Sequence, residues 1–110
     1  MNRVTLYSLV TDKIRITIVA YFDDDGNLII KGYDIGSIVE DIFGDSDYEY
    51  ITTIHRDNLE KLNVAFGLPI GSREEMLLFL KAHYDSNACY SQIQKYLTLH
   101  DIPFDKFSWM

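Results

Sequence analysis

Three histidines and one cysteine are the side chains best suited to bind a transition metal: His55, His83, Cys89 and His100. No two of them stand at the close spacing of a usual zinc site, so structural or surface roles are expected for each. The run Asp23-Asp24-Asp25-Gly26 begins like a calcium-binding loop, but the alternate-position ligands and the closing glutamate of an EF-hand are missing. A hairpin turn accounts better for these residues, and we expect no metal site and no cofactor.

Nucleophilic and acid–base chemistry have little more support. Cys89 falls on the apolar stripe of a predicted helix, which favours a small core residue over a catalytic thiol. The sequence contains no G-x-S-x-G turn, no G-x-x-x-x-G-K-[ST] phosphate loop and no G-x-G-x-x-G fingerprint. Carboxylates between Glu40 and Glu49 are able to supply an acid and a base, but nothing marks one of them as buried with a displaced pKa. We therefore expect that the protein is not an enzyme.

Acidic residues are concentrated in the middle third of the chain. The 110 residues carry a formal net charge of −7, and residues 23–60 alone hold eleven acidic and two basic side chains, a balance of −9. Affinity for a phosphate backbone comes from Lys and Arg that displace counterions, so nucleic acid is a disfavoured partner. A protein with a basic surface would instead be attracted. A solvated acidic face that only keeps the protein soluble is an equally good explanation.

Tyrosines gather beside this acidic segment, at positions 21, 33, 48 and 50. Tyrosine rings add contact area to an interface and keep a polar tip, although rings that merely cover a sheet would show the same pattern. Short loops keep the acids and the rings close in space, which predicts one continuous negative patch beside Tyr48 or Tyr50. The predicted partner-binding residues are Glu40, Asp41, Asp45, Asp47, Tyr48, Glu49 and Tyr50.

The elements that must position these residues begin with strands. Alternation over residues 14–22 places Ile14, Ile16, Ile18 and Ala20 on one face of a strand. Residues 4–10 and 28–33 are also typical of strands, and the Asp-Gly pair at 25–26 supplies the positive φ that a tight hairpin needs. Residues 48–55 predict a further strand with both Tyr48 and Tyr50 on one face.

A short helix is predicted where the period changes from 2 to 3.6. Its apolar stripe consists of Ile35, Ile38, Val39, Ile42 and Phe43. Asp34 is placed to cap its first turn, and Gly44 to end it in a left-handed conformation. Glu40 and Asp41 would point away from the stripe.

The second half of the chain is mainly helical. Asp57-x-x-Glu60 and Ser72-x-x-Glu75 have the spacing of reciprocal capping boxes, and each predicts a helix start. A third helix is expected to begin near Ser86-Asn87 and to end at Ile102-Pro103, since proline cannot continue it. The aromatic tail, residues 104–109, is expected to dock, as an edge strand.

This order predicts an α+β fold: one domain over residues 1–110, with an antiparallel sheet of three to four strands and helices packed on one face. The chain is 47% apolar, which excludes disorder as its main state. It has no apolar run near ~18 residues and no signal-peptide stretch after Met1, so we expect a cytoplasmic protein without membrane contact. The predicted core is Ile16, Ile18, Ile38, Ile42, Leu62, Phe66, Leu80, Ile93 and Leu97.

Four segments carry a family resemblance: residues 24–36 (DDGNLIIKGYDIG), 39–44, 45–50 (DSDYEY) and 100–104. Together they resemble a family of small, stand-alone bacterial domains of unknown function, with a DGNL-x-I-x-G-x-DIG strand-to-helix segment and a D-Y-E-Y strand. The resemblance implies no catalytic residue. In size and charge the chain is similar to immunity proteins of bacterial toxin systems. The resulting hypothesis is a non-catalytic bacterial binding protein that neutralises a toxin through its acidic, tyrosine-rich surface. The alternative is a small enzyme or ligand-binding domain with a pocket between sheet and helices.

Overall fold

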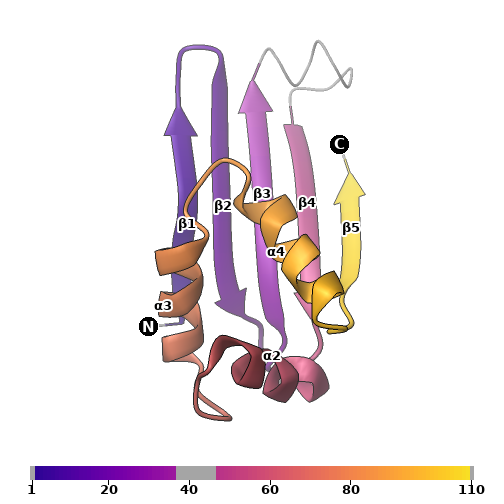
Figure 1. The fold of residues 1–110 in the computed structure, drawn as a ribbon. Helices are drawn as coiled ribbons and strands as arrows, with labels where there is room; N and C mark the ends of the chain where they lie inside the picture. Colours follow the sequence, from indigo (N-terminus) through magenta and orange to yellow (C-terminus); the bar gives the residue numbers. More distant parts are fainter. Residues whose placement is uncertain (1, 37–46, 110) are drawn as a thin grey trace.

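Among the residues that the structure describes, five antiparallel strands form one sheet in the order β1-β2-β3-β4-β5 (Figure 1). The computed structural model describes residues 2–36 and 47–109. The strands are β1 (Arg3–Val10), β2 (Ile14–Phe22), β3 (Leu28–Gly36), β4 (Asp47–Ile54) and β5 (Asp105–Trp109). The α+β class is confirmed, but the sheet has five strands where three to four were expected. The difference is the aromatic tail, which pairs with β4 and so completes the sheet as an edge strand.

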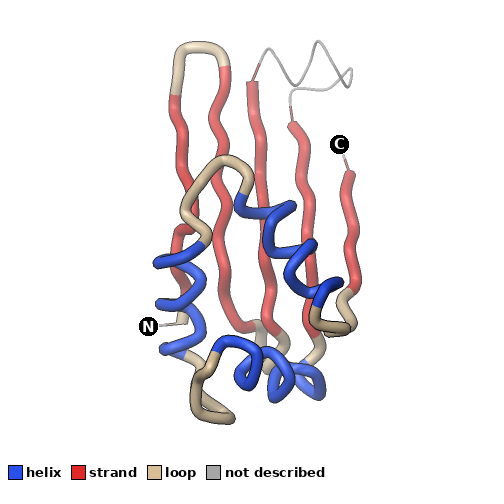
Figure 2. The backbone as a smooth tube through the Cα atoms, viewed as in Figure 1, coloured by secondary structure: helices blue, strands red, loops and turns tan. Residues whose placement is uncertain are grey.

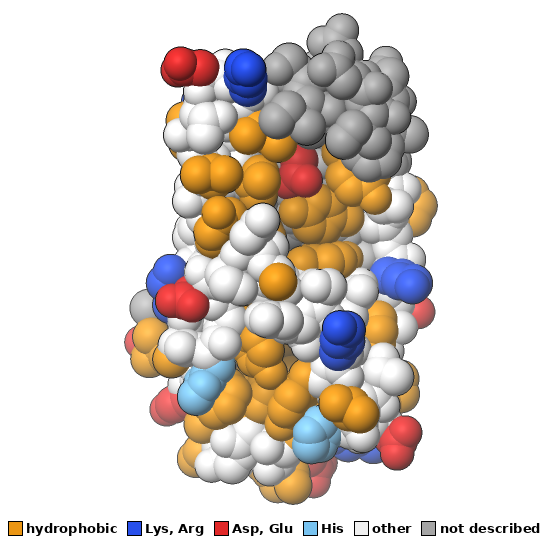
Figure 3. Space-filling view, turned by 45° about the horizontal axis from the view of Figure 1, so that its top comes forward, with side chains coloured by type: hydrophobic (Ala, Val, Ile, Leu, Met, Phe, Trp, Pro, Cys, Tyr) orange, Lys and Arg blue, Asp and Glu red, His pale blue; other side chains and the backbone are white. Residues whose placement is uncertain are grey.

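The helices all lie on one side of this sheet (Figures 1 and 2). They are η1 (Arg56–Asn58), α2 (Leu59–Phe66), α3 (Glu74–His83) and α4 (Cys89–Leu99). Helix α3 packs against β1, α2 lies at the end of the sheet where β2 turns into β3, and α4 runs obliquely towards β5 (Figure 1). The helices among the described residues cover the lower half of this face (Figure 1). In the upper half, hydrophobic side chains with an acidic one among them lie beyond the N-terminal end of α4 (Figure 3).

Strand register explains which side chains form the core. Ala20 is paired with Ile30, and Ile30 with Thr52, so all three point towards the helices and are fully buried. Five predicted core residues are at most 3% exposed: Ile18, Leu62, Leu80, Ile93 and Leu97. Ile16 and Phe66 pack against this core but are only partly buried. Ile38 and Ile42 lie outside the described residues.

The short helix predicted from Asp34 onwards does not begin there. Asp34 and Ile35 continue β3 and pair with Tyr48 and Asp47 of β4, and Gly36 pairs with Ile14 of β2. Strands on both sides form hydrogen bonds with the backbone of β3. These bonds favour a strand over the helix whose apolar stripe was predicted to begin at Ile35. The remainder of that prediction, residues 37–46, lies outside the described residues.

Neither predicted capping box forms. Helix α2 begins at Leu59 and α3 at Glu74, and neither has a side-chain cap. The Ser72 hydroxyl instead donates to the Pro69 carbonyl (2.7 Å) in the loop before α3. At η1 it is His55 that caps, because its Nδ1 accepts the Asp57 backbone N–H (3.1 Å). The helices thus start close to the predicted points through different contacts.

Candidate functional site

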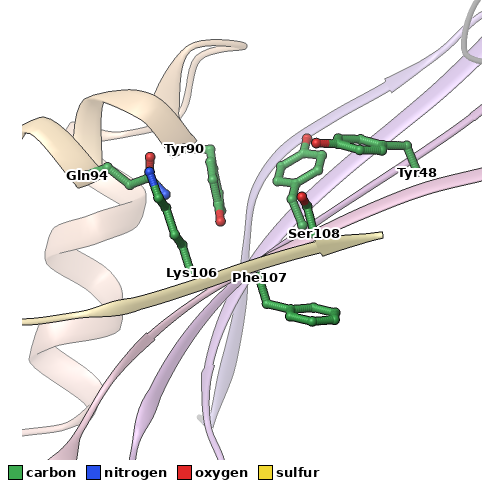
Figure 4. A pocket seen from close by; sticks show the side chains of 7 residues that line it. Tyr48, Tyr90, Gln94, Lys106, Phe107 and Ser108 are labelled. Atoms are coloured by element: carbon green, nitrogen blue, oxygen red, sulfur yellow. The ribbon is translucent and has the colours of Figure 1, made fainter. Parts of the chain in front are cut away.

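A groove lies between α4 and the outer strands of the sheet, in the part of the helix-side face that α4 only partly covers. It encloses about 370 Å³ and is lined by Tyr48 and Tyr50 of β4, Tyr90 and Gln94 of α4, and residues 106–108 of β5. In Figure 4 the Tyr48, Tyr90 and Gln94 side chains all lie on the same side of the β5 ribbon. The Phe107 side chain points to the other side of the sheet, so this residue offers mainly its backbone to the groove (Figure 4). We call this cavity the tyrosine groove.

The position of Tyr50 depends on the neighbouring strand. Gly32 is paired with Tyr50, and a Cβ at Gly32 would overlap the Tyr50 ring. The absence of a side chain therefore lets the ring lie against β3. From there the Tyr50 hydroxyl donates to Oδ1 of Asp34 (2.9 Å).

Burial controls the charge state of this pair. It raises the pKa of Asp34, and the hydrogen bond from Tyr50 only partly offsets that rise. Burial, followed by the charge of Asp34, also raises the pKa of Tyr50. Tyr50 therefore keeps its proton and remains a hydrogen-bond donor at neutral pH.

Three aromatic rings follow one another along the groove. The Tyr48 and Tyr50 ring centroids are 5.5 Å apart, and those of Tyr50 and Tyr90 are 4.6 Å apart with the rings nearly perpendicular. Edge-to-face pairs of this kind are favourable, because the positive edge of one ring meets the negative face of the other. The rings thus form one connected wall.

A buried hydroxyl holds the α4 end of this wall in place. Thr52 is fully buried, and its hydroxyl donates to the Tyr90 hydroxyl (2.7 Å) while accepting from Nε2 of Gln94 (2.9 Å). Both capacities of the Thr52 hydroxyl are therefore used. Because Asp34 holds Tyr50 and Thr52 holds Tyr90, the groove is ordered before any partner arrives, which lowers the entropy that binding loses.

The chemistry of the tyrosine groove is suited to recognition. Burial raises the pKa of Cys89, the one cysteine of the sequence and the residue before Tyr90, to about 11, so its thiol stays protonated at neutral pH. Within the described ranges, no three His, Cys, Asp or Glu side chains come together in a way that would hold a metal ion. Aromatic faces with a half-buried carboxylate behind them favour a cationic side chain as the guest.

The predicted site residues are only partly brought together. Tyr48 and Tyr50 both line the tyrosine groove. Glu49 lies on the opposite face of the sheet, where its Oε1 pairs with Nζ of Lys31 at 2.8 Å, because successive strand residues point to opposite faces. Asp47 is the first residue of β4. Glu40, Asp41 and Asp45 lie outside the described residues.

Several residues of the groove were missed by the sequence-based prediction. They are Asp34, Thr52, Tyr90, Gln94, Lys106 and Ser108. One signal was available: a glycine within a strand, here Gly32, often marks the close approach of another group. The partners that use this space come from β4 and α4, which no local pattern reveals.

Comparison with known proteins adds no relative: no protein-family model, curated protein or solved structure matches the chain. Among the described helices, none has the length and apolar character that crossing a membrane requires.

Proposed function

We propose that this chain is a non-catalytic, cytoplasmic bacterial domain that binds another protein, as an immunity protein covers its toxin. The partner places a basic side chain in the tyrosine groove. One observation supports this proposal above the others: Tyr48, Tyr50 and Tyr90 form a connected aromatic wall that is held by hydrogen bonds yet open to solvent.

Rigid tyrosines are common anchors of protein interfaces. They bury a large area while losing few rotamers, and residues that dominate binding energy are enriched in tyrosine. A Lys or Arg over a tyrosine face gains roughly 0.5–2 kcal/mol, more as water is excluded. The guest is expected on the Tyr48 side, since Lys106 adds a positive charge at the other end of the groove (Figure 4).

Charge also favours a basic partner. The chain carries a formal net charge of −7, so its field attracts a cationic protein and speeds the encounter. Asp34 adds a local negative charge, because it is paired with Tyr48 and lies on the helix-side face of the sheet. The overall field would bring the partner in, and the groove would select the side chain that enters.

The test compares two aromatic residues on opposite faces of the sheet. Wild-type, Tyr48→Ala and Phe107→Ala proteins are used as baits in the native host, and the partner captured by wild type is purified for calorimetry. Loss of the Tyr48 ring is expected to raise the Kd at least about tenfold, or about 1.4 kcal/mol. The Phe107 side chain is 62% exposed and points to the other face of the sheet, so Phe107→Ala is expected to bind like wild type. An unchanged Kd for Tyr48→Ala would reject the groove as the interface.

A further inference from the structure

A second cavity lies at the other end of the sheet, where the β2–β3 turn meets α2 and the loop before α3. It encloses about 270 Å³ and shares no residue with the tyrosine groove. Its polar lining consists of Arg56, Glu60, Asn63, Ser72 and Arg73, and its apolar lining of Phe22, Leu59, Ile70 and Met76. Figure 2 shows the turn, α2 and this loop together at the lower end of the sheet.

Two arginines converge on this cavity around Gly26. A Cβ built on Gly26 would lie 2.9 Å from Nη2 of Arg73 and 3.9 Å from Cβ of Arg56, so both side chains pass close to the turn. The Arg73 guanidinium lies over the Phe22 ring at 5.2 Å, and Nη1 of Arg56 donates to the Asp25 carbonyl (3.4 Å). Within residues 2–36 and 47–109, neither guanidinium forms an ion pair with a carboxylate. Both retain donors for an oxyanion.

Asn63 supplies an independent observation. The residue is only 2% exposed, and its Oδ1 is buried without any hydrogen-bond donor. Buried acceptors are almost always satisfied in native proteins, so an unsatisfied one calls for a missing partner. Glu60 lies three residues earlier on α2, which puts its carboxylate on the same helix face as Asn63. This wall of the cavity therefore offers acceptors, and the arginine wall offers donors.

We infer that this cavity binds a free amino acid with an apolar side chain. Arg56 and Arg73 would take the carboxylate, while Glu60 and the Asn63 oxygen would accept hydrogen bonds from the ammonium group. The apolar lining would surround the side chain. The size agrees with this class of ligand, because about 270 Å³ is just below the roughly 300–1,000 Å³ of sites for larger organic molecules.

The first experiment titrates the whole chain with L-leucine and two matched probes, using backbone amide NMR. Leucine is expected to shift the Gly26, Gly71 and Arg73 signals in a saturable way. Leucinamide lacks the carboxylate and N-acetyl-leucine lacks the ammonium group, and each is expected to bind at least about tenfold more weakly, the effect of one lost charge-assisted contact. Absence of saturable shifts with leucine, or equal affinity for all three probes, overturns the inference.

Variants of the chain's own residues complete the test. Arg73→Gln and Asn63→Leu are each expected to raise the Kd for leucine about tenfold or more. Asn63→Leu keeps the volume and removes an oxygen that has no donor, so its melting temperature is expected to equal or exceed that of wild type. Arg3→Gln, at an exposed arginine stacked on Tyr21 on the opposite face of the sheet, serves as the control. Unchanged leucine affinity in both cavity variants, with the fold intact, rejects the site and leaves the tyrosine groove untouched.

Discussion

The ring of Tyr50 lies against Gly32 on the neighbouring strand, in the space that a side chain at that position would fill. This contact sets the geometry of the tyrosine groove, because it brings the Tyr50 hydroxyl to Asp34 and the Tyr50 ring to Tyr90. A glycine in a strand normally weakens it, since it loses more conformational freedom and packs no side chain. Here the missing side chain is replaced by an aromatic ring from the next strand.

Gly32→Ala is expected to destabilise the fold by about 1–3 kcal/mol, the usual cost of forcing extra volume into a packed site. The added methyl group must displace the Tyr50 ring, so the effect should depend on that ring. Urea unfolding of Gly32→Ala, Tyr50→Ala and the double variant measures this dependence as a coupling energy. If the two single effects simply add, the contact does not constrain the ring.

Thr52→Val is expected to cost about 1–3 kcal/mol, because it preserves the shape but leaves the half-buried Tyr90 and Gln94 groups without their fully buried partner. Thr53→Val is the matched control: Thr53 is the next residue of β4, half-buried on the opposite face. Its change should fall within about 0.5 kcal/mol of zero. Equal losses for the two variants in denaturant unfolding would show that the hydroxyl of Thr52 has no special role.

Asp34→Asn is expected to change how stability depends on pH. The folded-state pKa of Asp34 lies above its ordinary value of 3.8, so folding favours the protonated acid. The stabilising effect is complete below pH 3.8 and is lost as the pH rises through the raised folded pKa. Relative to Asp34→Asn, wild type should therefore lose stability between acidic and neutral pH. Melting temperatures of both proteins from pH 3 to 7 check this, and parallel curves would contradict it.

The outline of the fold was predictable because its signals are local. Alternation in residues 14–22 and the apolar stripes of the later helices each depend on a few neighbouring residues, and Ile18, Leu80 and Leu97 are buried as predicted. The aromatic tail indicated an edge strand for a similar reason, since so many apolar side chains need a surface to pack against.

The site was only half predictable because its contacts are not local. The prediction of Tyr48 and Tyr50 followed from residue type and spacing. Their partners Asp34 and Tyr90 are selected by the register of β3 against β4 and by the path of α4 across the sheet. The same register separates Glu49 from the two tyrosines, although it stands between them in the sequence.

Burial of the helix faces can be tested on one helix. Leu80→Ala in α3 is expected to cost about 2–5 kcal/mol, because it removes a fully buried side chain from the core. Leu78→Ala, two residues earlier and 47% exposed, makes the same chemical change on the outer face and should cost much less. Thermal or urea unfolding of both variants measures the difference, and similar losses would mean that the buried face of α3 is assigned incorrectly.

Charge reversal separates an acidic interface from an acidic surface that only maintains solubility. Asp45→Lys with Asp47→Lys is expected to slow association with the captured basic partner, and to weaken its dependence on salt, more than it changes stability. Asp24→Lys with Asp25→Lys gives the same change in net charge, from −7 to −3, at the β2–β3 turn, the end of the sheet opposite to the start of β4 (Figure 1). Screening limits the reach of each charge to about 8 Å at physiological salt, so the two pairs should act differently near an interface.

Stopped-flow association rates at low and physiological salt provide the comparison. Equal slowing by both pairs would mean that only the overall charge attracts the partner, and no slowing by either would place the acidic segment outside recognition altogether.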